Sequence, residues 1–315
     1  MEDWRIVEYE GRWRRRWDDF VDASRNATFL FKRGYMDYHS DRFADFSMMA
    51  FKGERLLALL PANITPDGVL HSHQGLTYGG WILPVSHLDC VSMSAMWRVW
   101  LEYCREAGVK AIDYKPLPYI YSRMPSQEDR YLLFQGGARL DSVTISSAIS
   151  LADNPGFNAL QRRHLRKGSA LGVEIRETDD VRSFMDLTSR CLAERHSVRP
   201  VHTPEEMELL KSRFPEEIRI FGAFADGVMH AGVMVYDASV VAHCQYIATT
   251  PRGREENMLT LLFSYLINEA YAGKSYFDFG ISTEEGGKVL NEGLYRQKAS
   301  LGASGVECPR YTIEL

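Results

Sequence analysis

The chain has 315 residues, a net charge of −5 and a sequence pI of about 6.0. Hydrophobic residues make up 45% and charged residues 25%, which is the balance of a soluble globular protein with a sizeable core. A protein built to hold nucleic acid over an extended surface is usually basic, so DNA binding is excluded and tRNA binding is disfavoured. The length is sufficient for two domains of ordinary size.

The cysteines and the apolar runs indicate where in the cell the protein is located. Five cysteines are scattered without any C-x-x-C spacing, which predicts reduced thiols and neither a disulfide framework nor a zinc site. No apolar run reaches membrane-spanning length, and the N-terminal stretch is charged without a signal-peptide core. We therefore expect a cytoplasmic protein that makes no membrane contact.

In chain order, strands and helices alternate, which predicts an α/β protein with mixed sheets. The expected elements of the first half are strand 5–8, helices 12–23 and 35–43, a hairpin of 46–51 and 55–64, strand 70–83, helix 91–107, strand 111–115, helix 127–134 and strand 142–150. Those of the second half are strand 173–177, helices 181–195 and 204–214, a hairpin of 219–225 and 230–236, strand 240–248, helix 255–273 and strands 276–280 and 311–314.

The second half repeats the element order of the first. Ala111-Ile-Asp-Tyr matches Tyr276-Phe-Asp-Phe, so two local sequences agree as well as the order. Internal repeats fix the architecture when they are present. We predict two tandem lobes, 1–152 and 153–315, with the boundary in the turn sequence Asp153-Asn-Pro-Gly.

Residues 240–280 read as an apolar strand, a polar loop, an amphipathic helix and a second strand. A helix that opens just beyond a strand end presents unpaired N–H groups to an anion or a carbonyl. This unit resembles the central motif of the GNAT acyltransferase superfamily. Arg252 and Gly253 take the place of its pyrophosphate loop.

Further motifs are similar to the FemAB-like transferases and the related BioF2-like acetyltransferase domain. The stretch Leu160-Gln-Arg-Arg-His-Leu-Arg-Lys-Gly resembles the opening of their second domain, and Phe277-Asp-Phe-Gly with Gly293-Leu-Tyr-Arg-Gln-Lys resembles their closing pattern. Gln297 and Leu301 depart from the aromatics usual there. The resemblance covers nearly the whole chain and implies two tandem GNAT lobes that transfer an acyl or aminoacyl group to an amine.

The resemblance assigns catalytic residues to the second lobe. Lys298 is expected to stabilise the carbonyl oxyanion, and Tyr295, three residues earlier, to protonate a leaving thiolate. His243 lies on the first central strand, where alternation predicts one face with Gln245 and Ile247 and the other with Ala242, Cys244 and Tyr246. Asp278 on the second central strand could take a proton, orient the amine or cap the sheet.

The donor is expected to be acyl-CoA, in particular acetyl-CoA. Its predicted contacts are Gln245, Ile247, Arg252, Gly253 and Asn257. Glu255 and Glu256 in the first helical turn would repel a phosphate, so the alternatives remain a FemAB-type aminoacyl-tRNA-dependent transferase and a non-catalytic binding protein on this fold.

The acceptor is expected on the first lobe, as a small-molecule or saccharide-linked amine such as that of an amino sugar or cell-envelope precursor. Its predicted contacts are Lys32, Arg33, Tyr38, His39 and Lys115, although such a charged run more often marks a solvated helix face. No metal is expected, because the pair His71 and His73 lacks a carboxylate or thiol neighbour in the sequence.

Overall fold

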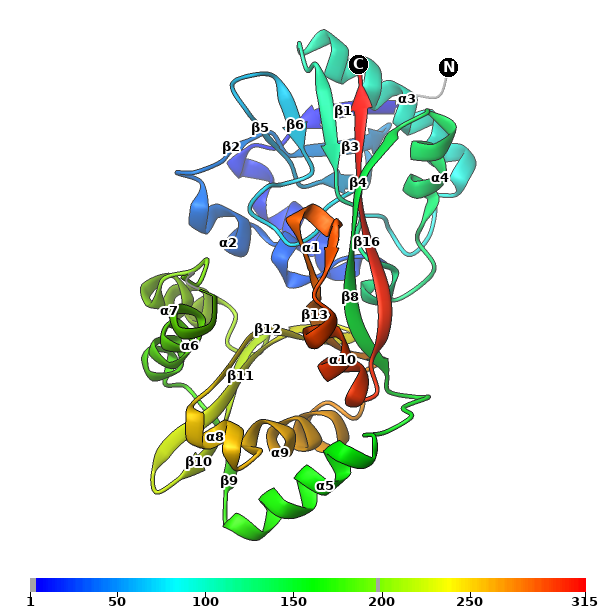
Figure 1. Cartoon of the computed structure of the whole chain (residues 1–315). Helices are drawn as coiled ribbons and strands as arrows, with labels where there is room; N and C mark the ends of the chain where they lie inside the picture. Colours follow the sequence, from blue (N-terminus) through cyan, green and yellow to red (C-terminus); the bar gives the residue numbers. More distant parts are fainter. Residues whose placement is uncertain (1–3, 197–198) are drawn as a thin grey trace. The chain divides into compact units, whose positions relative to one another are not determined.

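The structure is a computed structural model that describes residues 4–196 and 199–315, with the backbone alone described at residues 195 and 196 (Figure 1). The chain forms two compact units. Unit 1 holds residues 1–144, 284–289 and 307–315, and unit 2 holds residues 145–283 and 290–306. Both units mix helices and strands, which confirms the predicted fold class. The lobe boundary at residues 152 and 153 stays a prediction.

The first half contains, in order, β1 (Trp4–Glu8), α1 (Arg14–Ala23), α2 (Arg33–Met36), β2 (Ala44–Asp45), β3 (Met48–Lys52), β4 (Arg55–Leu60), β5 (Asn63–Ile64), β6 (Val69–His71), α3 (Cys90–Glu106), β7 (Ala111–Tyr114), α4 (Glu128–Gln135) and β8 (Arg139–Ser150). The second half contains α5 (Ala159–Gly168), β9 (Glu174–Thr178), α6 (Val181–His196), α7 (Pro204–Arg213), β10 (Ile218–Ala225), β11 (Val228–Ala238), β12 (Val241–Thr249), α8 (Pro251–Glu255), α9 (Met258–Tyr265), the π-helical turn η6 (Leu266–Ala270), β13 (Tyr276–Ile281), β14 (Thr283–Glu284), β15 (Val289–Leu290), α10 (Glu292–Ser300) and β16 (Ser304–Glu314).

Unit 1 is built on two sheets. Strands β1, β3 and β4 form one, and β2, β5, β6 and β7 lie in order in the other, with the C-terminal part of β16 beside β7. Strands β6 and β7 are parallel, whereas β3 and β4 form the predicted hairpin around Gly53. The core packs α3 against these strands through Trp97 and Trp100.

Unit 2 is built on the strand order β13, β12, β11, β10 and β9. Strand β12 is antiparallel to β11 and parallel to β13, as expected for the central unit. Helices α5 and α9 cover one face of this sheet, and α6 and α7 lie on the other (Figure 1). The main core lies under α9, where Met258 and Leu262 pack on β12.

Some predicted elements differ in extent. The helix expected over 255–273 is three segments, α8, α9 and η6, because Asn257 takes a left-handed conformation (φ 58°) between α8 and α9. The strand expected over 70–83 ends at His71, and His73 already has a positive φ of 68°. The β10–β11 hairpin turns at Asp226-Gly227 as predicted, with positive φ at both residues. Within the described ranges, no helix has the length and apolar character needed to cross a bilayer.

Candidate functional site

The site in unit 2 forms where β12 and β13 stop pairing. Their parallel register runs from Val241 opposite Tyr276 to His243 opposite Asp278, although β12 continues to Thr249. Beyond His243, the described part of β12 remains paired with β11 alone. The backbone edge of β12 that faces β13 is therefore open past His243, as the family resemblance implied.

A β-bulge sets the side-chain faces of β12. Cys244 lies opposite Val235 and Tyr246 lies opposite Met234, so Gln245 is the extra residue. After the bulge, Ile247 packs against the main core under α9. The expectation that His243, Gln245 and Ile247 share one face is therefore wrong, because simple alternation cannot anticipate an inserted residue.

Tyr246 is turned away from that core by the same bulge. Its hydroxyl lies 2.7 Å from Nδ1 of His202, which precedes α7. Burial raises the pKa of Tyr246. Ala248, two residues further on, packs with Leu187 of α6. Tyr246 therefore points to the face of the sheet that α6 covers, and not to the main core. The sequence contained no signal for this placement.

Asp278 makes hydrogen bonds to three other residues of the site. Its Oδ2 accepts from Nδ1 of His243 at 2.8 Å, and its Oδ1 accepts from the Ser146 hydroxyl at 2.6 Å and the Gly280 N–H at 3.1 Å. The carboxylate is 3% exposed. A carboxylate only accepts, so His243 carries its proton on Nδ1 and its Nε2 is the atom that can take up another. The contact with His243 was not among the three roles considered for Asp278, and those roles stay predictions.

Gly280 lies close to His243 and is hydrogen-bonded to Lys298. A side chain at Gly280 would begin 3.5 Å from Cε1 of His243, and the Gly280 carbonyl accepts from Nζ of Lys298 at 2.8 Å. Nζ also donates to the Ile281 carbonyl at 2.7 Å. The ammonium thus uses two of its three protons on backbone oxygens.

Lys298 is buried, with only 5% of its surface exposed. Burial lowers its pKa to about 8, and the Asp278 carboxylate opposes this shift. Helix α10 therefore turns Lys298 inward. Tyr295, one turn earlier, is partly buried, and its hydroxyl lies against β16, 3.3 Å from where a Gly305 side chain would begin.

The loop expected to hold pyrophosphate is already bonded internally. Arg252 donates to Asp226 at 2.7 Å and to Glu256 at 3.0 Å, and the Gly253 N–H donates to the Thr250 hydroxyl. A side chain at Gly253 would begin 2.2 Å from the His230 carbonyl, so packing requires this glycine. Any diphosphate bound here would have to draw Arg252 from its two carboxylates.

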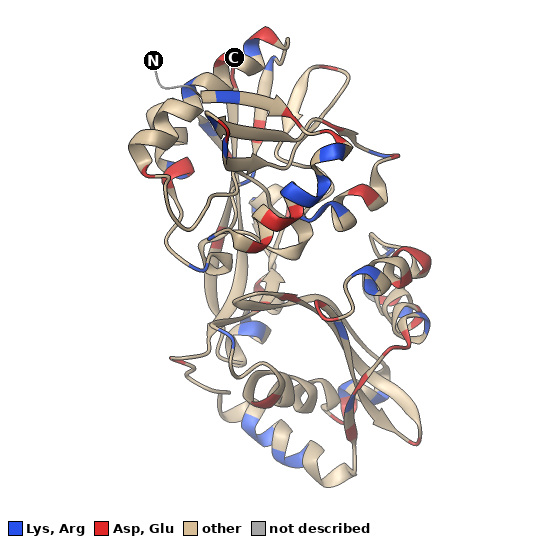
Figure 2. Ribbon diagram, turned by 180° about the vertical axis from the view of Figure 1, so that it is seen from behind, with Lys and Arg blue, Asp and Glu red and all other residues tan. Residues whose placement is uncertain are grey.

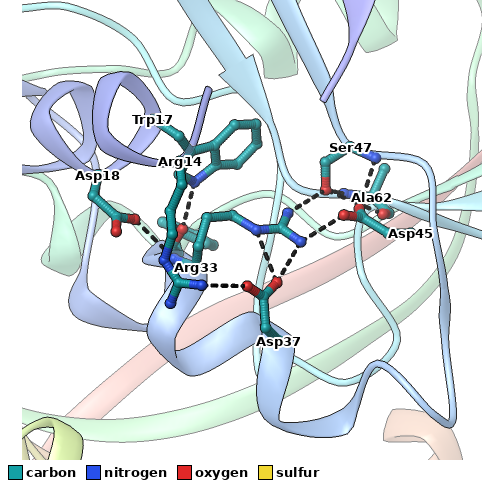
Figure 3. Close-up of polar contacts among 9 residues, drawn as sticks. Arg14, Trp17, Asp18, Arg33, Asp37, Asp45, Ser47 and Ala62 are labelled. Atoms are coloured by element: carbon teal, nitrogen blue, oxygen red, sulfur yellow. Dashed lines mark hydrogen bonds and ion pairs between the residues drawn. The ribbon is translucent and has the colours of Figure 1, made fainter. Parts of the chain in front are cut away.

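Two of the predicted acceptor contacts in unit 1 make internal ion pairs. Figure 3 shows the Arg33 guanidinium between Asp37 and Asp45, each 2.5 Å from Nη2, with Ser47 at 3.3 Å from Nη1. The Arg33 side chain is 5% exposed. Lys32 pairs with the exposed Asp22 at 2.8 Å and remains accessible.

The other predicted acceptor contacts form an aromatic group and a separate lysine. The rings of Tyr38 and His39 are 4.3 Å apart, and His39 stacks on His73 at 5.2 Å. Burial lowers the pKa of His73 to about 3. Lys115 donates to the Leu76 carbonyl at 2.9 Å. His73 therefore does not share a strand face with His71 as expected, and within residues 4–196 and 199–315 no cluster of three metal-ligating side chains occurs.

Residues 160–286 match the family described as acetyltransferase (GNAT) domain. The matched residues include β12, the loop after it and β13, and hence His243 and Asp278. No curated protein matches the sequence.

Solved structures extend the similarity over the whole chain. FemX covers 99% of this chain and 97% of its own at 11% identity, with a TM-score of 0.71. The C-terminal domain of a putative lysylphosphatidylglycerol synthetase from Agrobacterium fabrum covers 95% and 92% at 14% identity, with a TM-score of 0.60. A tandem GNAT protein from the clavulanic acid biosynthesis pathway covers 99% and 98% at 12% identity, with a TM-score of 0.53. These structures show that the chain has a FemAB-like tandem GNAT fold, which confirms the fold that the sequence resemblance implied.

Sequence reasoning missed Ser146. It lies on β8, where Ser146 pairs with Ile281 of β13, and its hydroxyl reaches Asp278 across 132 residues of sequence. A serine in an apolar strand has no local signature of such a contact. Only the partly repeated strand order could have suggested that β8 borders the site.

We predict that Arg33 serves folding. Arg33→Met would leave Asp37 and Asp45 without their shared cation and should lower the free energy of unfolding by about 3–5 kcal/mol, since one member of a buried pair is lost. Lys32→Met should change it by less than about 0.5 kcal/mol. Urea denaturation of both variants tests this. Equal stability of the two variants would contradict it, and Lys32→Met is the variant suited to measuring acceptor affinity.

We predict that Asp278 acts through His243. Asp278→Asn would place an amide beside Nδ1, weaken its hold on the Nδ1–H tautomer and lower kcat by roughly a hundredfold or more. Ser146→Ala keeps the carboxylate and the His243 contact, so its kcat should fall by less than about tenfold. Steady-state kinetics with circular dichroism as a folding check compares the two, and equal losses would refute the positioning role.

Proposed function

We propose that this protein transfers an acyl group from acyl-CoA, in particular acetyl-CoA, to the amine of a small-molecule or saccharide-linked acceptor. The observation that carries this proposal is the end of the β12–β13 pairing at His243 and Asp278, inside the matched GNAT domain. An extended thioester can align with the open edge of β12, where backbone N–H groups face its carbonyl. Next to that point, Gly280 lies close to the His243 ring and its carbonyl accepts a hydrogen bond from Lys298.

Each group then has one role in the transfer. The amine nitrogen forms the new C–N bond, and its proton passes to Nε2 of His243, whose tautomer Asp278 fixes. Negative charge builds on the carbonyl oxygen and is stabilised by the third N–H of Lys298. The C–S bond breaks, and the thiolate takes a proton from Tyr295. The tyrosinate regains a proton from solvent and His243 releases one to solvent, which restores both residues.

Burial supports the role of Lys298. Two carbonyl dipoles hold the ammonium, and no carboxylate makes a direct ion pair with it among the described residues. A cation that is not already neutralised by contact can respond to charge that appears only in the transition state. The lowered pKa of Lys298, about 8, still leaves the group mostly charged at neutral pH.

A second donor class has its own support. Arg252 is occupied by Asp226 and Glu256, which weakens the case for a diphosphate contact. Helix α5 instead presents exposed basic side chains, and Figure 2 shows them as blue bands along it. Arg163, Arg166 and Lys167 have no carboxylate partner in the part of the chain that is described. This basic helix favours the aminoacyl-tRNA alternative, because unpaired cations bind phosphates.

Calorimetric titration separates the donors. With acetyl-CoA, we expect saturable binding that survives in the double variant Arg163→Gln/Arg166→Gln, since α5 has no part in the acyl-CoA proposal. With a charged tRNA, we expect no saturable binding. Binding of the charged tRNA alone, lost in the α5 variant, would establish the alternative. Binding of neither would overturn both donors and leave the non-catalytic reading.

The charge of Lys298 should appear in the pH profile. A lysine with a pKa of about 8 is charged below that value, so kcat should decline as pH rises through about 8. Lys298→Arg keeps its charge and should lack this decline. Lys298→Met should lose turnover at least roughly tenfold at pH 7, with about 1–3 kcal/mol of stability lost because two carbonyls lose their donor.

Wild type and Lys298→Arg are compared by the shape of their kcat–pH profiles and not by the absolute value of kcat, because the larger guanidinium alters the geometry of the site. A decline above pH 8 that persists in Lys298→Arg would assign it to another group. Full turnover in a folded Lys298→Met protein would exclude the oxyanion role.

A further inference from the structure

Unit 1 contains a second histidine–aspartate pair in the same strand context as the first. The parallel register of β6 and β7 ends with His71 opposite Asp113, as that of β12 and β13 ends with His243 opposite Asp278. Nδ1 of His71 lies 2.7 Å from Oδ2 of Asp113. The sequence had suggested no carboxylate neighbour for His71, and the strand pairing supplies one.

The two pairs differ in what else binds the carboxylate. Asp278 accepts from a hydroxyl and a backbone N–H, both neutral. Asp113 accepts from Nε and Nη2 of Arg310, each at 2.6 Å, in a two-pronged ion pair from β16. An arginine held this way compensates the negative charge of Asp113 by direct contact.

Lys115 adds a second cation. It follows Asp113 by two positions in extended backbone, and its Nζ has one acceptor among the described residues, the Leu76 carbonyl. Burial lowers the pKa of Lys115 to about 8, the Arg310 charge adds to this, and Asp113 opposes it. Asp141, the next carboxylate near Arg310, is paired with Arg139. The group therefore holds two cations for one carboxylate.

We propose that Lys115 and Arg310, arranged around Asp113 and His71 in unit 1, form a binding site for an anionic group, a carboxylate or a phosphate. The Arg310 side chain is 50% exposed, and the N–H groups it does not give to Asp113 remain for a ligand. Lys115 keeps two protons without an acceptor in the described chain. A partly buried surplus of positive charge is stabilised by an anion, whose oxygens can accept the N–H groups that both cations leave over.

This site is distinct in chemistry from the one in unit 2. There, Lys298 is held by two backbone carbonyls, and Asp278 accepts from the neutral donors of Ser146 and Gly280. In unit 1 the carboxylate at the corresponding strand position, Asp113, is already paired with Arg310, and Lys115 adds a second cation. We therefore assign this group to the binding of an anion and not to proton transfer. The proposal does not depend on the acyl-transfer reaction.

Lysine labelling measures anion binding directly. The full-length protein is treated at pH 8 with an amine-acetylating reagent, in inorganic phosphate, in acetate, or in sodium chloride at equal ionic strength, and modified sites are mapped by mass spectrometry. A bound anion raises the pKa of Lys115 and shields it, so its modification should slow by roughly threefold or more. Lys52 and Lys110 are internal references whose rates should not change.

Variants test whether Arg310 is part of the site. Arg310→Gln should abolish the protection of Lys115, and Arg310→Lys, which keeps the cation and is the safer variant for folding, should retain part of it. Arg219→Gln, which removes a comparable two-pronged pair with Glu177 in unit 2, is the matched control and should leave protection intact. Protection of Lys115 by phosphate alone indicates a phosphate ligand. Protection by acetate alone indicates a carboxylate ligand. No protection by either anion, or full protection in folded Arg310→Gln, overturns the proposal.

Discussion

A strand that gains one residue cannot stay in register with both neighbours, and Gln245 is that residue in β12. The strand keeps its pairing with β11 on one side and gives up β13 on the other after His243. In β13, Gly280 takes a positive φ of 79°, which turns that strand just after Asp278. The opening at the centre of unit 2 results from these two backbone irregularities, and the other groups of the site are arranged around it.

Both units place a carboxylate where the parallel pairing ends, and each carboxylate must be satisfied because burial without partners is costly. In unit 2, neutral donors from Ser146 and Gly280 satisfy Asp278 and leave its charge available to His243. In unit 1, Arg310 satisfies Asp113 with a full positive charge. The two histidine–aspartate pairs therefore differ in the charge of the groups that satisfy their carboxylates.

The parts of this structure that were predictable from sequence depend on nearby residues. The Asp226-Gly227 turn, the order of β12, α9 and β13, and the match of Asp113 with Asp278 all follow from local composition or from repetition within the chain. Periodicity assumes an uninterrupted strand, so it could not detect the Gln245 bulge and assigned Ile247 to the wrong face.

Contacts between distant segments were not predictable in the same way. Ser146 reaches Asp278 only because β8 pairs with β13. A run of charged residues looks solvated in sequence, and nothing local distinguished the buried Arg33 from the accessible Lys32 next to it. In each case, the deciding information is which strands lie side by side, which a single sequence encodes weakly.

Lys298 and Arg33 show how burial can serve different ends for similar charges. Arg33 is in contact with two carboxylates, which compensate its charge directly. Lys298 meets two backbone carbonyls, which orient the ammonium without cancelling its charge. Asp278 is near enough to oppose the lowering of its pKa, yet its own oxygens are given to His243, Ser146 and Gly280. Lys298 therefore keeps a positive charge in a low-dielectric setting, and it is there that a developing oxyanion gains the most from a fixed cation.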